Sequence, residues 1–160
     1  MFRLPTTSSP TPGETLIALD VRPLIARGRD PLATILATLE AIPRAGVLVL
    51  ETPFRPAPLL ALLTRRGHAV FAEELATDDW VVEVVVGATP PIADLRGLEP
   101  PEPLGRVLEA CATLAPGQVY LARLPHYPRL LVPHLHTRGL PYGIIERPDG
   151  SVLLRVERPR

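Results

Sequence analysis

Cysteine, lysine and asparagine are scarce or absent in this sequence. Its 160 residues include one cysteine, Cys111, and neither lysine nor asparagine. A single cysteine cannot form a disulfide within the chain, and it excludes a cysteine-rich zinc site. The 17 basic residues, all arginine, balance 17 acidic residues. Because the net charge is zero, the chain lacks the basic surface typical of proteins that bind nucleic acid or anionic membranes, and we expect neither as a partner.

Long hydrophobic runs are also missing. No mainly apolar stretch approaches the ~18 residues that cross a bilayer. Residues 1–14 contain proline, serine and threonine where a signal peptide has its apolar run. We therefore expect a cytoplasmic protein with a flexible N-terminal tail at residues 1–14. About a third of the residues are leucine, isoleucine, valine or phenylalanine, which is enough to build a folded core.

An internal repeat divides the chain. The motif Asp-x-Arg-x-Leu begins at Asp20 and again at Asp94. Further along, an offset of 72 residues aligns Pro31-Leu32 with Pro103-Leu104, Pro53 with Pro125, Pro56 with Pro128, and Arg66-Gly67 with Arg138-Gly139. We therefore predict two copies of one unit, at residues 15–87 and 92–160, joined by a linker at 88–91. Each copy is small for an independent core, so we expect the two to pack against each other.

Hydrophobic periodicity predicts the same elements in each copy. In the first copy, the predicted strands are 16–21, 47–50, 69–75 and 80–86, and the helices are 31–42 and 58–66. In the second copy, the strands are 92–95, 118–123, 141–146 and 151–157, and the helices are 102–114 and 128–138. The order β-α-β-α-β-β implies a four-stranded mixed sheet with both helices on one face. The predicted fold class is therefore α/β, as two α+β two-layer sandwiches.

The predicted strand at residues 80–86 is apolar on both faces apart from Glu83. Because side chains alternate along a strand, Val81 and Val85 should lie on the sheet face away from the helices. Valine side chains left in water would forgo burial free energy, so we expect the second copy or a second chain to cover this face. A homodimer is one of the two assemblies that this pattern predicts.

The second copy contains a proline-rich segment ahead of its first helix. Residues 94–103 read Asp-Leu-Arg-Gly-Leu-Glu-Pro-Pro-Glu-Pro, and Pro116-Gly117-Gln118 precedes the next strand. This pattern resembles the TusA (SirA-like) sulfur-carrier family, whose domains open with Asp-x-x-Gly-Leu-x-Cys-Pro-x-Pro. Val132-Pro133 and Gly67-His68-Ala69-Val70 resemble further motifs of that family. The resemblance extends over both copies and implies a TusA-like fold for each.

The carriers of that family depend on a cysteine at a helix N-terminus, where free amides and the helix dipole stabilise a thiolate or persulfide. Pro100 stands at that place in the second copy, and Gly28 stands there in the first. Neither copy can carry a persulfide at this position. The chain therefore resembles more closely the tandem, cysteine-less bacterial relatives of unknown function than the carriers themselves.

Histidine and cysteine residues suggest few sites. His126, His134 and His136 lie within eleven residues, and imidazole is a common metal ligand. On a helix, positions 134 and 136 point about 200° apart and cannot share one metal, so we expect exposed histidines and no cofactor. We expect Cys111, on the apolar stripe of its helix, to be buried and inert. We expect His68 to make a structural hydrogen bond.

The repeated pairs Asp20/Arg22 and Asp94/Arg96 leave two hypotheses open. In the structural one, the aspartate caps the turn and the arginine pairs with it. In the functional one, an anion-binding pocket lies at the N-terminus of the helix 31–42. Its residues would be Arg22, Arg27, Arg29, Asp30 and, in the second copy, Arg96.

The sequence also shows none of the common catalytic motifs at their known spacing. No Ser-His-Asp set, phosphate-binding glycine loop or pair of catalytic carboxylates occurs at a recognisable spacing. We therefore predict a non-enzymatic binding or regulatory module that has a protein partner and consists of two TusA-like domains without the carrier cysteine. Two alternatives stay open: an accessory protein of sulfur transfer or redox metabolism that docks a partner, and a histidine-based metal or haem binder.

Overall fold

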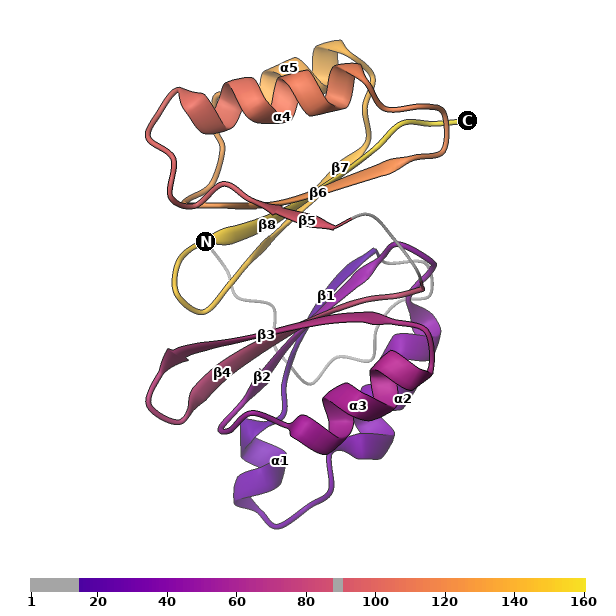
Figure 1. Cartoon of the computed structure of the whole chain (residues 1–160), viewed down its shortest axis with the longest axis vertical. Helices are drawn as coiled ribbons and strands as arrows, with labels where there is room; N and C mark the ends of the chain where they lie inside the picture. The colour runs from indigo at the N-terminus through magenta and orange to yellow at the C-terminus, as the bar shows by residue number, and fades with distance from the viewer. Residues whose placement is uncertain (1–14, 88–90) are drawn as a thin grey trace. The chain divides into compact units, whose positions relative to one another are not determined.

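The computed structural model describes residues 15–87 and 91–160 (Figure 1). It divides into two compact units, the first ending at Thr89 and the second beginning at Pro90. Below, unit 1 denotes the described residues 15–87, and unit 2 denotes residues 91–160. The predicted tail and most of the predicted linker lie outside the described residues. The packing of the two copies against each other stays a prediction.

Unit 1 contains one mixed sheet and its helices. In chain order its elements are β1 (Leu16–Asp20), α1 (Arg22–Ala26), α2 (Leu32–Ala41), β2 (Val47–Thr52), α3 (Ala57–Arg65), β3 (Ala69–Ala76) and β4 (Asp79–Val85). The strand order is β1-β2-β4-β3. Strands β1 and β2 are parallel, whereas β4 is antiparallel to both β2 and β3.

Unit 2 repeats this arrangement. Its elements are β5 (Ile92–Asp94), α4 (Glu102–Ala112), β6 (Val119–Leu124), α5 (Val132–Thr137), β7 (Tyr142–Glu146) and β8 (Val152–Glu157). The strand order β5-β6-β8-β7 matches that of unit 1, with a parallel β5–β6 pair and antiparallel partners for β8. The predicted fold class, two repeated two-layer units with four-stranded mixed sheets, is confirmed.

Each unit has a hydrophobic core between its sheet and its helices, which cover one face of the sheet (Figure 1). In unit 1, Val82 and Val84 belong to this core, so the intervening Val81, Glu83 and Val85 alternate to the opposite face. In unit 2, the core includes Val152, Leu154 and Val156 of β8. The alternation of side chains along each strand therefore shows which strand residues face the helices in both sheets.

The sequence analysis missed helix α1 and placed the start of α5 too early. Helix α1 has only five residues, too few to show a periodic pattern, and Pro23 stands in its first turn, where proline is tolerated. In unit 2 the corresponding stretch runs into Pro100-Pro101, which disfavours a helix. The predicted helix 128–138 begins only at Val132, because Pro128 to Leu131 form a turn.

No helix among residues 15–87 and 91–160 has both the length and the apolar character that crossing a membrane requires.

Candidate functional site

The repeated aspartate and arginine pairs close the turn after the first strand of each unit. In unit 1, the backbone N–H and the Nε of Arg22 both donate to Oδ1 of Asp20 at 3.0 Å, and Nη2 donates to Oδ2 at 2.9 Å. In unit 2, the corresponding distances from Arg96 to Asp94 are 3.3, 2.8 and 2.6 Å. This is the geometry that the structural hypothesis predicts for both pairs.

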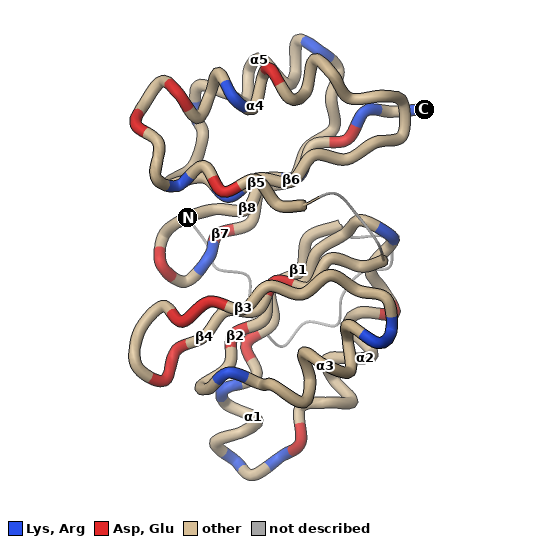
Figure 2. Tube along the Cα trace, in the orientation of Figure 1, with Lys and Arg blue, Asp and Glu red and all other residues tan. Residues whose placement is uncertain are grey.

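Arg22 lies among three carboxylates. Besides Asp20, its guanidinium contacts Glu51 at 2.5 Å and Asp79 at 3.5 Å. The hydrogen bond to Asp20 and the charges of Glu51, Asp20 and Asp79 outweigh burial and raise the pKa of Arg22. Asp79 lies at the acidic turn of the β3–β4 hairpin (Figure 2). Arg22 is thus engaged by anions of its own unit.

Arg96 occupies the same place in unit 2. Its guanidinium also lies 3.9 Å from Asp149. The hydrogen bond from Arg96 lowers the pKa of Asp94 to about 2. Asp94 is therefore ionised at neutral pH, where it pairs with Arg96.

The remaining residues of the predicted anion site lie near the start of α2. Oδ1 of Asp30 accepts a hydrogen bond from the Leu32 N–H at 2.9 Å and so caps this helix. Arg29 and Asp30 line a cavity of unit 1, whereas Arg27 ends helix α1. The structure therefore brings Arg29 and Asp30 together and places Arg22 in the carboxylate cluster. Anion binding at this place stays a prediction.

The three clustered histidines have separate surroundings. His126 lies in the loop between β6 and α5, and His134 and His136 lie on α5. Nε2 of His136 is 3.3 Å from the Tyr142 hydroxyl, and the two rings meet edge to face. Within the described part of the chain, no group of three or more His, Cys, Asp or Glu side chains is placed to hold a metal ion.

The structure confirms the predicted burial of Cys111 and the predicted structural hydrogen bond of His68. Cys111 is fully buried in the core of unit 2, and this burial raises the pKa of its thiol. Nδ1 of His68 accepts a hydrogen bond from the Gly87 N–H at 3.2 Å. Both residues therefore contribute to the packing or hydrogen bonding of their own unit.

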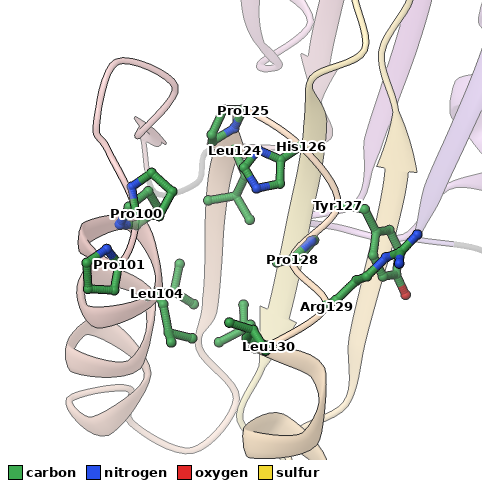
Figure 3. A pocket seen from close by; sticks show the side chains of 13 residues that line it. Pro100, Pro101, Leu104, Leu124, Pro125, His126, Tyr127, Pro128, Arg129 and Leu130 are labelled. Carbon is green, nitrogen blue, oxygen red and sulfur yellow. The ribbon is translucent and has the colours of Figure 1, made fainter.

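An apolar cavity of about 290 Å³ opens in unit 2 between the start of α4 and the β6–α5 loop (Figure 3). Its walls are Pro100, Pro101, Pro103, Leu104, Val107, Leu124, Pro125, His126, Tyr127, Pro128, Arg129, Leu130 and Leu131. Figure 3 shows the His126 imidazole on the cavity side of the loop, whereas Tyr127 and Arg129 point to the other side. We call this cavity the unit 2 pocket.

Unit 1 has a pocket of about 440 Å³ at the same place, between the start of α2 and the β2–α3 loop. Nine of its lining residues are repeat equivalents of residues in the unit 2 pocket. The pairs are Arg29/Pro101, Pro31/Pro103, Leu32/Leu104, Ile35/Val107, Thr52/Leu124, Phe54/His126, Pro56/Pro128, Pro58/Leu130 and Leu59/Leu131. The repeat therefore duplicates a pocket as well as a fold.

Exposed apolar side chains gather at these pockets. Leu130 is 77% exposed and Tyr127 is 37% exposed at the unit 2 pocket, and Phe54 is 51% exposed at the unit 1 pocket. Among the described residues, Phe71 is the other large apolar side chain of comparable exposure. An apolar cavity with exposed apolar side chains on its rim is typical of a binding surface.

Sequence reasoning missed the unit 2 pocket, and in unit 1 it predicted an anion site where the structure has a largely apolar pocket. The signal was present in the prolines that mark the repeat, since Pro31, Pro56 and their equivalents Pro103 and Pro128 all line the cavities. In the sequence these prolines serve only to align the two copies, and their position on a common wall becomes visible only when helix and loop are brought together.

Comparison with known proteins gives one match. No curated protein and no solved structure matches the chain. The family described as "Uncharacterized conserved protein (DUF2249)" matches residues 18–86 and again residues 92–158. These two matches coincide with the two repeated sheets and their pockets. The chain therefore belongs to the DUF2249 family and carries two copies of its domain.

Proposed function

We propose that this protein is a non-enzymatic, cytoplasmic interaction module in which each unit presents an apolar pocket to a partner protein. The observation that carries this proposal is the duplicated pocket with its exposed rim. Maintaining Leu130 and Phe54 in water forgoes roughly 1.5–3 kcal/mol of burial free energy per side chain. A partner that covers these side chains recovers that free energy.

The size and lining of the pockets support a binding role. Ligand pockets commonly measure about 300–1,000 Å³, and the cavities here, of about 290 and 440 Å³, lie at the low end of that range. Such volumes suit one or two apolar side chains. The residues that line the unit 2 pocket include no serine, cysteine, aspartate or glutamate, so His126 has no nucleophile or orienting carboxylate beside it there.

The position of the unit 2 pocket favours a second candidate, an accessory role in sulfur transfer. Pro100, which stands where the resembling carriers have their cysteine, lines this pocket. A partner that docks such carriers would meet the same face.

Incubation with a cysteine desulfurase and cysteine should leave the protein mass unchanged, because its one thiol, Cys111, is buried. A persulfide on Cys111 would overturn the non-carrier role.

Site-specific crosslinking tests the interaction module. We expect p-benzoylphenylalanine at position 54 or at position 130 to crosslink to a partner on irradiation in the source cells. The same residue at position 109, exposed on α4, should not give that product. The product is identified by mass spectrometry, and titration of the purified partner should give a Kd that weakens when Leu130→Asp is introduced. Crosslinking from position 109 alone would contradict the proposed function.

A further inference from the structure

The unit 2 pocket combines an apolar floor with one polar ring on its lip. Leu104, Val107 and Leu124 form an apolar wall, and His126 stands on the cavity side of the β6–α5 loop (Figure 3). In unit 1 the equivalent of His126 is Phe54. A neutral imidazole has one nitrogen that donates a hydrogen bond and one that accepts, and a single polar atom of a ligand can pair with either. The unit 2 pocket therefore favours an apolar group that carries one hydrogen-bonding atom.

The volume narrows the choice of that group. A cavity of about 150 Å³ accommodates benzene, so the cavity of about 290 Å³ has room for a single or a fused aromatic ring. Proline rings supply much of the wall, and their fixed φ angles leave little conformational freedom to lose on binding. Tyrosine and tryptophan combine a flat apolar ring with one polar atom.

The charged side chains beside the unit 2 pocket indicate which residues of a partner would flank the bound aromatic ring. Arg129 lies on the loop that lines the pocket, is exposed, points to the outer side of that loop (Figure 3), and makes no ion pair with any of the residues in the described ranges. Glu102, at the start of α4, instead pairs with Arg106 at 3.2 Å. In unit 1, Arg29 lines the equivalent pocket. Arg29 stands beside Asp30 in the unit 1 pocket, whereas the lining of the unit 2 pocket has an arginine and no carboxylate. The arginine of unit 2 complements a carboxylate of the partner.

We propose that the unit 2 pocket binds an acidic segment of a partner protein, with a tyrosine or tryptophan ring in the cavity and a neighbouring carboxylate on Arg129. The segment continues over the exposed Leu130 and across the loop to Tyr127 and Arg129 on its outer side, a surface that a free aromatic molecule could not cover. This inference rests on the proposed function and specifies the chemistry of its partner.

Titration of the full chain with three short peptides tests the inference. Binding is monitored by the chemical-shift changes of unit 2 backbone amides in NMR spectra. The probes are acetyl-Glu-Tyr-Glu-amide, acetyl-Glu-Leu-Glu-amide and acetyl-Arg-Tyr-Arg-amide. We expect the first to bind about tenfold more tightly than either control, with shifts centred on His126 and Leu104 and an affinity that falls with salt.

Charge variants isolate the contribution of Arg129. Arg129→Glu should weaken the acidic tyrosine peptide about tenfold and strengthen the basic one. The matched control Arg65→Glu, which makes the same charge change at the end of α3, should alter neither affinity. Arg129→Gln gives a second measure if the reversed charge impairs folding, which circular dichroism would show.

The outcomes separate this inference from the proposed function. Equal binding of the leucine peptide would overturn the aromatic assignment, and tighter binding of the basic peptide would overturn the acidic one. Absence of binding by all three peptides would overturn the inference as a whole. In each case, crosslinking from positions 54 and 130 still decides the proposed function independently.

Discussion

At the residue scale, the hydrogen bond from the Gly87 N–H to His68 makes the stability of the fold depend on whether the His68 imidazole is protonated. Nδ1 can accept this bond only while it carries no proton. Burial lowers the pKa of His68 from its ordinary value of 6.5, and the positive charge of Arg66 lowers it further. The folded chain therefore holds this proton less tightly than the unfolded chain.

The pH dependence of stability follows from that difference. The contribution of His68 is fully present above the unfolded pKa, near 6.5, and is lost as the pH falls toward the lower folded pKa. We expect the urea midpoint to fall between about pH 8 and about pH 5.5, and to fall less in His68→Gln. The exposed His134→Gln is the control and should retain the parental slope. If the urea midpoint of His68→Gln depends on pH as steeply as that of the parent, the pKa of His68 does not differ between the folded and unfolded states.

Single residues were predictable where their immediate neighbours decide their role. The burial of Cys111 followed from its helical stripe, and the bond of His68 followed from its place at a strand start after Gly67. The role of His126 did not, because its pocket is completed by prolines more than twenty residues earlier in the chain. A histidine in a loop has no local pattern that shows whether it faces solvent or a cavity.

At the element scale, the turns before β2 and β6 show one backbone conformation made by two different residues. Ala45 has a φ of 65° and its repeat equivalent Gly117 has a φ of 82°. The next residue closes the turn in both units, with N–H to carbonyl distances of 2.9 Å to Pro43 and 3.0 Å to Ala115. The left-handed conformation favours glycine, so unit 1 carries strain that unit 2 lacks.

Exchanging these residues should shift stability in opposite directions. Ala45→Gly removes about 1–2 kcal/mol of left-handed backbone strain from the folded state. Glycine also loses more conformational entropy on folding, which costs about 0.5–1 kcal/mol. We therefore expect a net gain of about 0.5–1 kcal/mol in the free energy of unfolding. Gly117→Ala should lose stability, since its new Cβ would also lie 3.0 Å from Arg160 Nε. Urea unfolding measures both.

Gly105→Ala serves as the control for these exchanges. Gly105 lies within helix α4 with open space around its Cα, so alanine there should stabilise the protein by roughly 0.5–1 kcal/mol. A stabilising Gly117→Ala would contradict the left-handed turn. Residues at such turns are hard to assign from sequence, because Ala45 gives no sign of an unusual φ, whereas Gly117 after Pro116 does.

At the scale of the whole molecule, the valine-rich face of the unit 1 sheet bears on the state of assembly. Val81 and Val85 lie on the face opposite the helices. We expect Val81→Lys with Val85→Lys to lower the urea midpoint at an unchanged mass of 17.4 kDa if the cover comes from the same chain. If a second chain supplies the cover, light scattering should show the mass falling to that of a monomer.

The matched control for this double substitution is Ala33→Lys with Ala37→Lys, at exposed positions of α2. It adds the same charge and should change neither the midpoint nor the mass. If the valine variant also leaves both unchanged, the expectation that this face is covered is wrong.

The architecture was more predictable than the site. The repeat, the sequence of strands along the chain and the helix-side faces follow from local patterns of apolar residues, and both units confirm them. The pockets lie where a helix start meets a distant loop, so no local pattern contains them. Proline marks both places in the sequence, but the wall that the prolines form depends on the tertiary fold.

The separate cores of the two units have a consequence for how this sequence can diverge. Each core is made of residues from its own unit, and Phe54 and His126 stand on the pocket rims outside both cores. A mutation at either rim position can therefore be inherited without loss of folding, and it leaves the sister pocket intact. Under the proposed function, such a mutation would change what one unit recognises while the other unit keeps its older preference.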